Sequence, residues 1–128
     1  MGAWLRWQRL PGVELAANSA AAAILADAGW PTEGPSDADV TMVVFTDYRC
    51  PACRMADPAM RRALAADDKV RVIYRDWPVF GEASRRAARV ALASDMQGHY
   101  GAVHERLMRA RGLEHQETVF AAVEAAGA

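Results

Sequence analysis

The two cysteines of this chain lie in one short motif, Cys50-Pro51-Ala52-Cys53, and the sequence contains no others. Residues 40–46 before the motif are apolar and β-branched and predict a buried strand, whereas residues 51–66 after it predict a helix. A Cys-x-x-Cys pair at a strand-to-helix junction is typical of dithiol–disulfide chemistry. The motif therefore indicates a redox-active pair on an α/β framework.

The position of the motif on the predicted helix suggests different roles for the two thiols. Pro51 suits the first helical position, where its missing N–H costs nothing. The helix N-terminus then directs unpaired N–H groups and the positive end of its dipole at Cys50, which favours the thiolate, the attacking species. We expect Cys50 to be exposed and to attack, and Cys53, one turn later, to be more buried and to resolve. Nearby charge is mixed: Arg49 and Arg54 favour the thiolate, partly offset by Asp47 and Asp57.

Two other interpretations of the cysteine pair stay open at this point. A structural disulfide between them would close so small a loop that it would remove little entropy from the unfolded chain. A zinc site would need two more ligands, and the histidines, at 99, 104 and 115, lack zinc-finger spacing. The redox interpretation is therefore favoured over an inert disulfide or a metal site.

Size and charge limit the other possibilities. The 128 residues suit one domain, and a net charge of −1 gives no electrostatic case for nucleic acid or an anionic membrane as partner. No run of about 18 apolar residues predicts a membrane span. Arg6 and Arg9 precede an alanine-rich stretch, 16–25, but Asn18 and Ser19 interrupt it, so an ordinary amphipathic helix is favoured over a signal peptide.

The remaining pattern alternates strand and helix and then becomes helical. Helical segments are predicted at 13–28, 82–97, 99–111 and 116–126, a turn-rich linker at 30–39, and a second strand at 70–77. Strand 40–46, apolar on both faces, is expected to be a central parallel strand, and 70–77 to alternate buried and exposed positions. Pro58 should kink the helix at 51–66. Strand, helix and strand in this order predict a right-handed βαβ unit.

Several segments together resemble the DsbA-like thiol oxidoreductases of the thioredoxin superfamily. Residues 45–54 resemble the active site of that family. Residues 72–81, with Ser84, Ala87 and Ala88, resemble the strand, turn and first inserted helix that follow it. The segment 97–100 with His104 and Leu107-Met108 is also similar, so the resemblance covers roughly residues 38–111.

The resemblance implies a partial thioredoxin-like fold of the α/β class with a helical insertion. We expect an N-terminal helical segment and linker at 1–38, then the βαβ unit and helical region at 39–128, in one domain. The implied activity is that of a thiol:disulfide oxidoreductase in the periplasm or another extracytoplasmic compartment, with Cys50 as nucleophile and Cys53 as resolving thiol. No metal or organic cofactor beyond the Cys50–Cys53 disulfide is implied. The implied partners are protein substrates and a redox partner protein.

Residues around the motif depart from the family pattern or complete it. Ala52 replaces the histidine of the strongest oxidants and cannot donate a hydrogen bond to the Cys50 thiolate, so we expect a less oxidising pair. Val44 replaces a buried acid six residues before the first cysteine, which removes the usual proton acceptor for the resolving thiol. Asp47 either substitutes for that acid or caps the catalytic helix, and capping is favoured. Tyr48 is expected to shield the disulfide.

The largest departure is length. The family continues into a cis-proline beside the disulfide, two antiparallel strands and a last helix, whereas this chain stops at Ala128. Two parallel strands with open edges are unlikely to be stable alone. An N-terminal strand, pairing with a second chain, or a truncated product would each account for this, and self-association or a fragment is favoured. If the chain is truncated in this way, we expect its oxidoreductase activity to be impaired. The alternative is a redox-impaired binding module with the same partial fold.

The remaining conspicuous residues are interpreted as structural. Trp4 and Trp7 suit a core or interface. Trp77 and Phe80 either form apolar surface near the active site or pack under the insertion, and packing is favoured. His104 is expected to be a core or surface residue without a catalytic role. The arginines at 85, 86 and 89 are expected on a solvated helix face.

Overall fold

A computed structural model of the chain describes residues 12–26 and 28–128. The predicted Trp4/Trp7 cluster, the basic residues Arg6 and Arg9, and Asp27 lie outside the described residues. The elements in chain order are α1 (Ala20–Leu25), β1 (Thr32–Glu33), β2 (Val40–Thr46), α2 (Pro51–Ala66), β3 (Val70–Asp76), α3 (Glu82–Asp95), α4 (Tyr100–Arg109) and α5 (Gln116–Ala125). This mixed α/β arrangement confirms the predicted fold class.

The described strands form one sheet in the order β1-β3-β2. β2 pairs in parallel with β3, from Val40 opposite Val70 to Thr46 opposite Asp76, with α2 connecting them. The predicted βαβ unit is therefore present. β2, however, is an edge strand among the described residues, and β3 takes the central place that the sequence predicted for β2.

The central position of β3 explains its burial. Val72, Ile73 and Tyr74 are all fully buried, so the expected alternation of buried and exposed residues is wrong. Alternate side chains still point to opposite faces, but both faces are covered at the middle of the strand. On edge strand β2, by contrast, Val40 is 54% exposed and Phe45 is 49% exposed.

A short N-terminal strand pairs with the edge of β3 that faces away from β2. β1 lies inside the predicted linker 30–39 and ahead of the predicted boundary at 38, and pairs antiparallel with β3. The Tyr74 N–H also donates to the Pro31 carbonyl at 2.9 Å, and Pro31 is fully buried. Of the three ways to complete the sheet, the described residues thus contain the N-terminal strand, whereas self-association stays a prediction.

The alanine-rich segment forms much less helix than predicted. Among the described residues of the expected 13–28, only Ala20–Leu25 is helical, and it is capped by the Ser19 hydroxyl, which accepts the Ala22 N–H at 3.1 Å. None of its residues is buried, because alanines offer little apolar surface to pack, and short helices need packing to be stable. Arg75 stabilises the other end by donating to the carbonyls of Ala23, Ile24 and Ala26.

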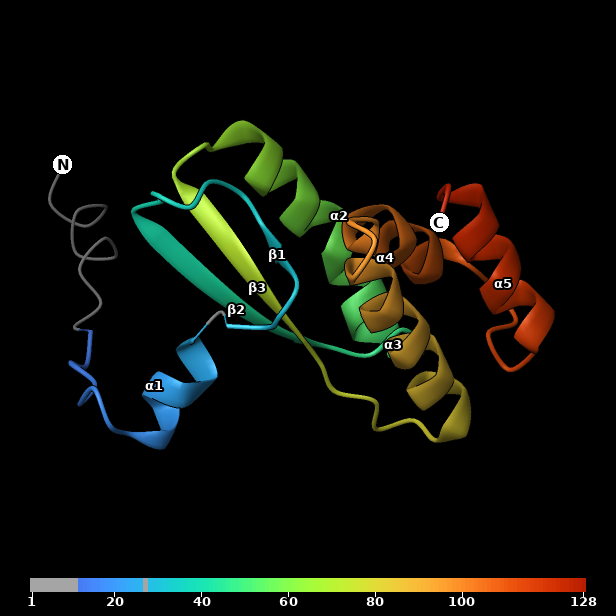
Figure 1. The fold of residues 1–128 in the computed structure, drawn as a ribbon, viewed down its shortest axis with the longest axis horizontal. Helices are drawn as coiled ribbons and strands as arrows, with labels where there is room; N and C mark the ends of the chain where they lie inside the picture. Colours follow the sequence, from blue (N-terminus) through green and yellow to red (C-terminus); the bar gives the residue numbers. More distant parts are fainter. Residues whose placement is uncertain (1–11, 27) are drawn as a thin grey trace, which may run out of the picture.

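The last three helices form the main core with one face of the sheet. Figure 1 shows α3, α4 and α5 grouped together, with α1 apart from them across the sheet. Their bounds agree with prediction to within about two residues, and Pro58 lies inside α2 without ending it. The core contains side chains from the sheet, the three helices and the connection between α4 and α5, among them Val72, Tyr74, Ala87, Ala91, Tyr100, Val103, Leu107, Leu113 and Val119.

Two methionines of the helical region test how much this packing contributes to stability. Met108 is 4% exposed, whereas Met96 is 91% exposed. Because the cavity left by a buried methionine is not refilled, Met108→Ala should lower the free energy of unfolding by about 2–5 kcal/mol. The matched change Met96→Ala should alter it by less than about 0.5 kcal/mol. Urea denaturation followed by circular dichroism measures both values, and equal losses would contradict the assigned core.

Candidate active site

The cysteine motif lies where the sequence placed it, at the start of α2. Cys50 is the N-cap residue, and its Sγ accepts the Cys53 backbone N–H at 3.3 Å. Pro51 occupies the first turn and Ala52 is exposed beside it. Both thiols are free and half-buried. The sulfur of Cys50 is thus held at the positive end of the helix, next to unpaired backbone N–H groups.

The two thiols differ in electrostatic environment. A hydrogen bond from the Cys53 thiol, with the backbone N–H groups of Cys53 and Ala52, lowers the pKa of Cys50, although the charge of Asp47 opposes this. Burial, followed by the hydrogen bond to Cys50, raises the pKa of Cys53. Negative charge therefore concentrates on Cys50 while Cys53 keeps its proton. This is the asymmetry that a nucleophile and a resolving thiol require.

The neighbouring arginines are engaged with backbone carbonyls. Arg49 donates to the Phe80 carbonyl at 2.9 Å. Arg54 donates to the carbonyl of Tyr48 at 2.9 Å, to that of Leu107 at 3.3 Å, and to that of Ala110. Arg54 thereby joins the loop before Cys50 to the end of α4.

Asp47 has a different role from the one favoured above. Its carboxylate accepts the N–H groups of Arg49, Val79 and Phe80 and the hydroxyl of Ser84, at 2.7–3.1 Å. The N-cap of α2 is Cys50, so the expected capping by Asp47 is wrong. The carboxylate instead ties the loop that carries Cys50 to the segment between β3 and α3.

An exposed apolar surface adjoins the thiols. Trp77 is 60% exposed and Phe80 48% exposed, so the favoured packing of these two rings under the helical insertion is wrong. The Trp77 ring meets Phe45 edge to face at 5.8 Å between centroids. With Val79, these rings line a small cavity of about 120 Å³ that also contains Cys50 and Cys53. We call Phe45, Trp77, Val79 and Phe80 the apolar rim.

A second, larger hollow of about 700 Å³ flanks the motif on the side of the helical region. It lies between the first turn of α2 and the connection from α4 to α5. Its charged lining is mostly basic, and its apolar lining includes two methionines. The residues are Arg49, Pro51, Arg54, Met55, Met108, Arg109, Ala110, Arg111, Gly112, Leu113 and Glu114.

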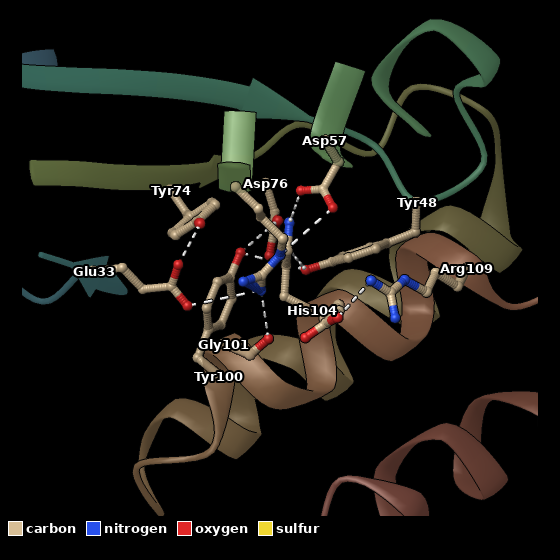
Figure 2. A network of polar contacts seen from close by, with 11 residues as sticks. Glu33, Tyr48, Asp57, Tyr74, Asp76, Tyr100, Gly101, His104 and Arg109 are labelled. Atoms are coloured by element: carbon tan, nitrogen blue, oxygen red, sulfur yellow. Dashed lines mark hydrogen bonds and ion pairs between the residues drawn. The ribbon is translucent and has the colours of Figure 1, made fainter. Parts of the chain in front are cut away.

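A buried polar network that the sequence pattern does not predict lies behind the motif (Figure 2). His104 is 1% exposed; its Nε2 lies 3.0 Å from Asp57 Oδ1 and its Nδ1 lies 3.0 Å from the Tyr48 hydroxyl. The Tyr48 hydroxyl also bonds the Tyr100 hydroxyl at 3.3 Å, and Tyr100 donates to Asp76 at 3.2 Å. Tyr48, expected to shield the disulfide, is thus fully buried with its hydroxyl in this network.

Part of this network has a sequence signal. Asp57 follows Cys53 by four residues, a spacing that places two side chains on one face of a helix. His104 has no such signal, because its contacts join α4 to α2 and to the loop after β2.

The network continues towards the N-terminal strand (Figure 2). Arg61 lies 3.6 Å from Asp57 and 3.8 Å from Glu33, and donates to the Gly101 carbonyl at 2.8 Å. Glu33 accepts the Tyr74 hydroxyl at 2.7 Å. A Cβ on Gly101 would meet the Glu33 carboxylate, so a side chain there would have to displace the end of Glu33. β1 is therefore joined to α2 by an ion pair as well as to β3 by strand pairing.

Within 12–26 and 28–128, no group of three or more histidines, cysteines and acidic residues is arranged to hold a metal ion. No helix in the described part of the chain has the length and apolar character needed to cross a bilayer.

Comparison with known proteins agrees with the geometry of the motif. The family model described as thioredoxin matches residues 28–127. The chain is 40% identical to a thioredoxin-like oxidoreductase from Silicibacter pomeroyi, with a TM-score of 0.76 over 81% of this chain and 60% of that one. It is 33% identical to a periplasmic thioredoxin-like protein from Salmonella enterica serovar Typhimurium, with a TM-score of 0.80 over 92% and 67% of the two chains.

A thiol–disulfide exchange protein and a transporter are also similar. The chain is 28% identical to the exchange protein alpha-DsbA2 from Wolbachia pipientis, with a TM-score of 0.74 over 79% of this chain and 55% of that one. It is 35% identical over 86 residues to the Na(+)/H(+) antiporter NhaA 3 of Salinispora tropica, matching 66% of this chain and 12% of the antiporter. The family model and the matching oxidoreductase and exchange-protein structures confirm the DsbA-like resemblance, and the chain spans only part of each relative.

Replacing Cys53 should change the ionisation of Cys50. Since the Cys53 thiol makes the largest contribution to lowering the pKa of Cys50, Cys53→Ala should raise that pKa, whereas Cys53→Ser keeps a donor and should raise it less. The rate of Cys50 alkylation by iodoacetamide as a function of pH measures the pKa in both variants. An unchanged pKa in Cys53→Ala would show that backbone N–H groups alone stabilise the thiolate.

Asp76 should make stability depend on pH. Burial raises the pKa of Asp76 to about 6, from an ordinary 3.8, and its Oδ2 has no hydrogen-bond partner among the described residues. The folded chain therefore keeps a proton that the unfolded chain loses. The stability that the folded chain gains by holding this proton is present at low pH and is lost as pH rises through about 6. Asp76→Asn should be more stable than wild type by up to about 2–3 kcal/mol above pH 7, with the difference vanishing near pH 4. Urea denaturation across this pH range measures the difference in unfolding free energy, with the exposed Asp68→Asn as control. A difference that does not change with pH would contradict the raised pKa of Asp76.

Proposed function

This chain belongs to the thioredoxin family whose model it matches, and on that basis we propose that it is a thiol–disulfide oxidoreductase acting on protein thiols through Cys50 and Cys53. The observation that carries the proposal is the position of Cys50 Sγ, which accepts the Cys53 N–H at the first turn of α2. Its lowered pKa and the raised pKa of Cys53 distinguish an attacking from a resolving thiol. The oxidoreductase and the exchange protein similar to this chain also support it.

The reaction follows from this asymmetry. The Cys50 thiolate attacks one sulfur of a substrate disulfide, and the other substrate sulfur leaves as a thiolate. Cys53 then attacks Cys50 in the mixed disulfide, which releases the second substrate sulfur and leaves a Cys50–Cys53 disulfide. The same steps in reverse pass a disulfide to a reduced substrate. A redox partner protein is needed to restore the starting state.

The surroundings of the motif suit a protein substrate. The apolar rim is exposed beside both thiols and can contact the apolar side chains that an incompletely folded substrate displays. Ala52 contributes only its backbone N–H to Cys50, which supports the expectation of a modest oxidant. An extracytoplasmic location is part of the proposal, and the periplasmic protein from Salmonella enterica supports it.

Replacement of single cysteines tests the roles of the two thiols. Cys53→Ala should accumulate mixed disulfides with a model substrate that carries a disulfide, because the resolving thiol is gone. Cys50→Ala should accumulate few, because the high pKa of Cys53 leaves little thiolate to attack. Non-reducing electrophoresis and mass spectrometry measure the adducts.

A redox titration of the wild-type chain with glutathione is the control. It should show one disulfide forming and breaking reversibly. A chain that binds unfolded substrate equally well with both cysteines replaced, and does not cycle a disulfide, would instead be a binding module.

A further inference from the structure

The resolving thiol lacks an acidic neighbour at the position where the resemblance predicts one. Val44, six residues before Cys50, is apolar and lines the same cavity as Cys53. Burial raises the pKa of Cys53, so this thiol is protonated at neutral pH and must lose its proton before it attacks. Some other group must accept that proton.

The cavity behind Cys53 offers such a group. Its volume is about 300 Å³, which is enough for water, and its lining is mostly apolar. Besides Cys53, the titratable side chains in the lining are Asp57 and His104. Asp57 is one helical turn after Cys53, a spacing that separates Cβ atoms by about 5–6 Å. The lining comprises Val44, Phe45, Thr46, Ala52, Cys53, Ala56, Asp57, Met60 and His104.

The acid and the imidazole form a fixed pair. Asp57 Oδ1 lies 3.0 Å from His104 Nε2, with both side chains buried. The Tyr48 hydroxyl lies 3.0 Å from His104 Nδ1 and holds the ring from its other side. Burial acts to raise the pKa of Asp57, but the hydrogen bond and charge of His104 and the charge of Arg61 outweigh it, so the carboxyl stays ionised.

We propose that the Asp57–His104 pair accepts the proton of Cys53, through water in this cavity, when Cys53 attacks the mixed disulfide. The inference rests on the proposed function. The proton passes from Cys53 to the pair, the new bond joins the sulfurs of Cys50 and Cys53, and the substrate sulfur leaves with its electron pair as a thiolate. In the reverse reaction the pair returns the proton.

The charged groups around the pair determine its pH response. Arg61 on α2 lies 3.6 Å from Asp57, and the charge of Arg109 on α4 also acts on that carboxyl. Tyr100 on α4 and Tyr74 on β3 pack against the His104 ring. The charge of His104 acts on Asp76 at the end of β3, which accepts from the Tyr100 hydroxyl. Tyr48 and Tyr100 are positioning residues, because they act on the proton acceptor rather than on sulfur.

Ellman's reagent separates the two sulfur steps in the full chain. The reduced chain is mixed with one equivalent of reagent, and release of the coloured thiol is followed by stopped flow across a pH series. The first release reports attack by Cys50, and the second, independent of concentration, reports attack by Cys53. Asp57→Asn and His104→Gln should leave the first rate within twofold of wild type and slow the second at least tenfold at pH 7. The difference should close as pH rises above the pKa of Cys53, because hydroxide then removes the proton.

The controls distinguish proton transfer from a structural effect. Glu124→Gln removes an exposed carboxylate of α5, and should change neither rate. Added imidazole should restore part of the second rate in His104→Gln, which lost packing alone would not allow. The inference is overturned if both variants, folded by circular dichroism, keep the wild-type second rate and its pH profile. A wild-type chain that shows no second release would overturn the proposed function as well.

Discussion

The parallel pairing of β2 with β3 is the constraint on which the rest of the site depends. Because Thr46 lies opposite Asp76, both strands end at the same edge of the sheet, and the segments that follow them meet there. Asp47 joins those segments by accepting three hydrogen bonds, from Val79, Phe80 and Ser84, and α2 begins within the same loop. The thiols, the apolar rim and the buried histidine therefore lie around one sheet edge.

The sequence predicted the parts of the structure that depend on local pattern. Strand 40–46, helix 51–66 and the position of Cys50 at a helix start follow from residue periodicity and from Pro51. The later helices are separated by Gly98 and Gly112, whose positive φ suits glycine. Such signals involve residues a few positions apart, and are therefore visible in one sequence.

The features that the sequence did not predict depend on distant partners. β1 has only two residues, and its pairing is determined by β3, about forty residues later. Asp47 resembled a helix cap because it precedes a helix, but its main partners come from 79–84. His104 resembled an ordinary core residue, because its acid and its phenol are contributed by other elements. The long helix predicted for the alanine-rich segment is wrong for a different reason, because helix propensity without packing produced only the short α1.

The hydrogen bonds of Arg54 limit how far α4 can move relative to α2. Its guanidinium donates to one carbonyl just before the motif and to two more at the end of α4. Any rigid-body shift of α4 against α2 would break at least one of these bonds and leave buried acceptors without a donor. The reactive loop and the α4 end of the helical layer therefore move as one body, and a hinge that admits a bulky substrate has to lie outside that body.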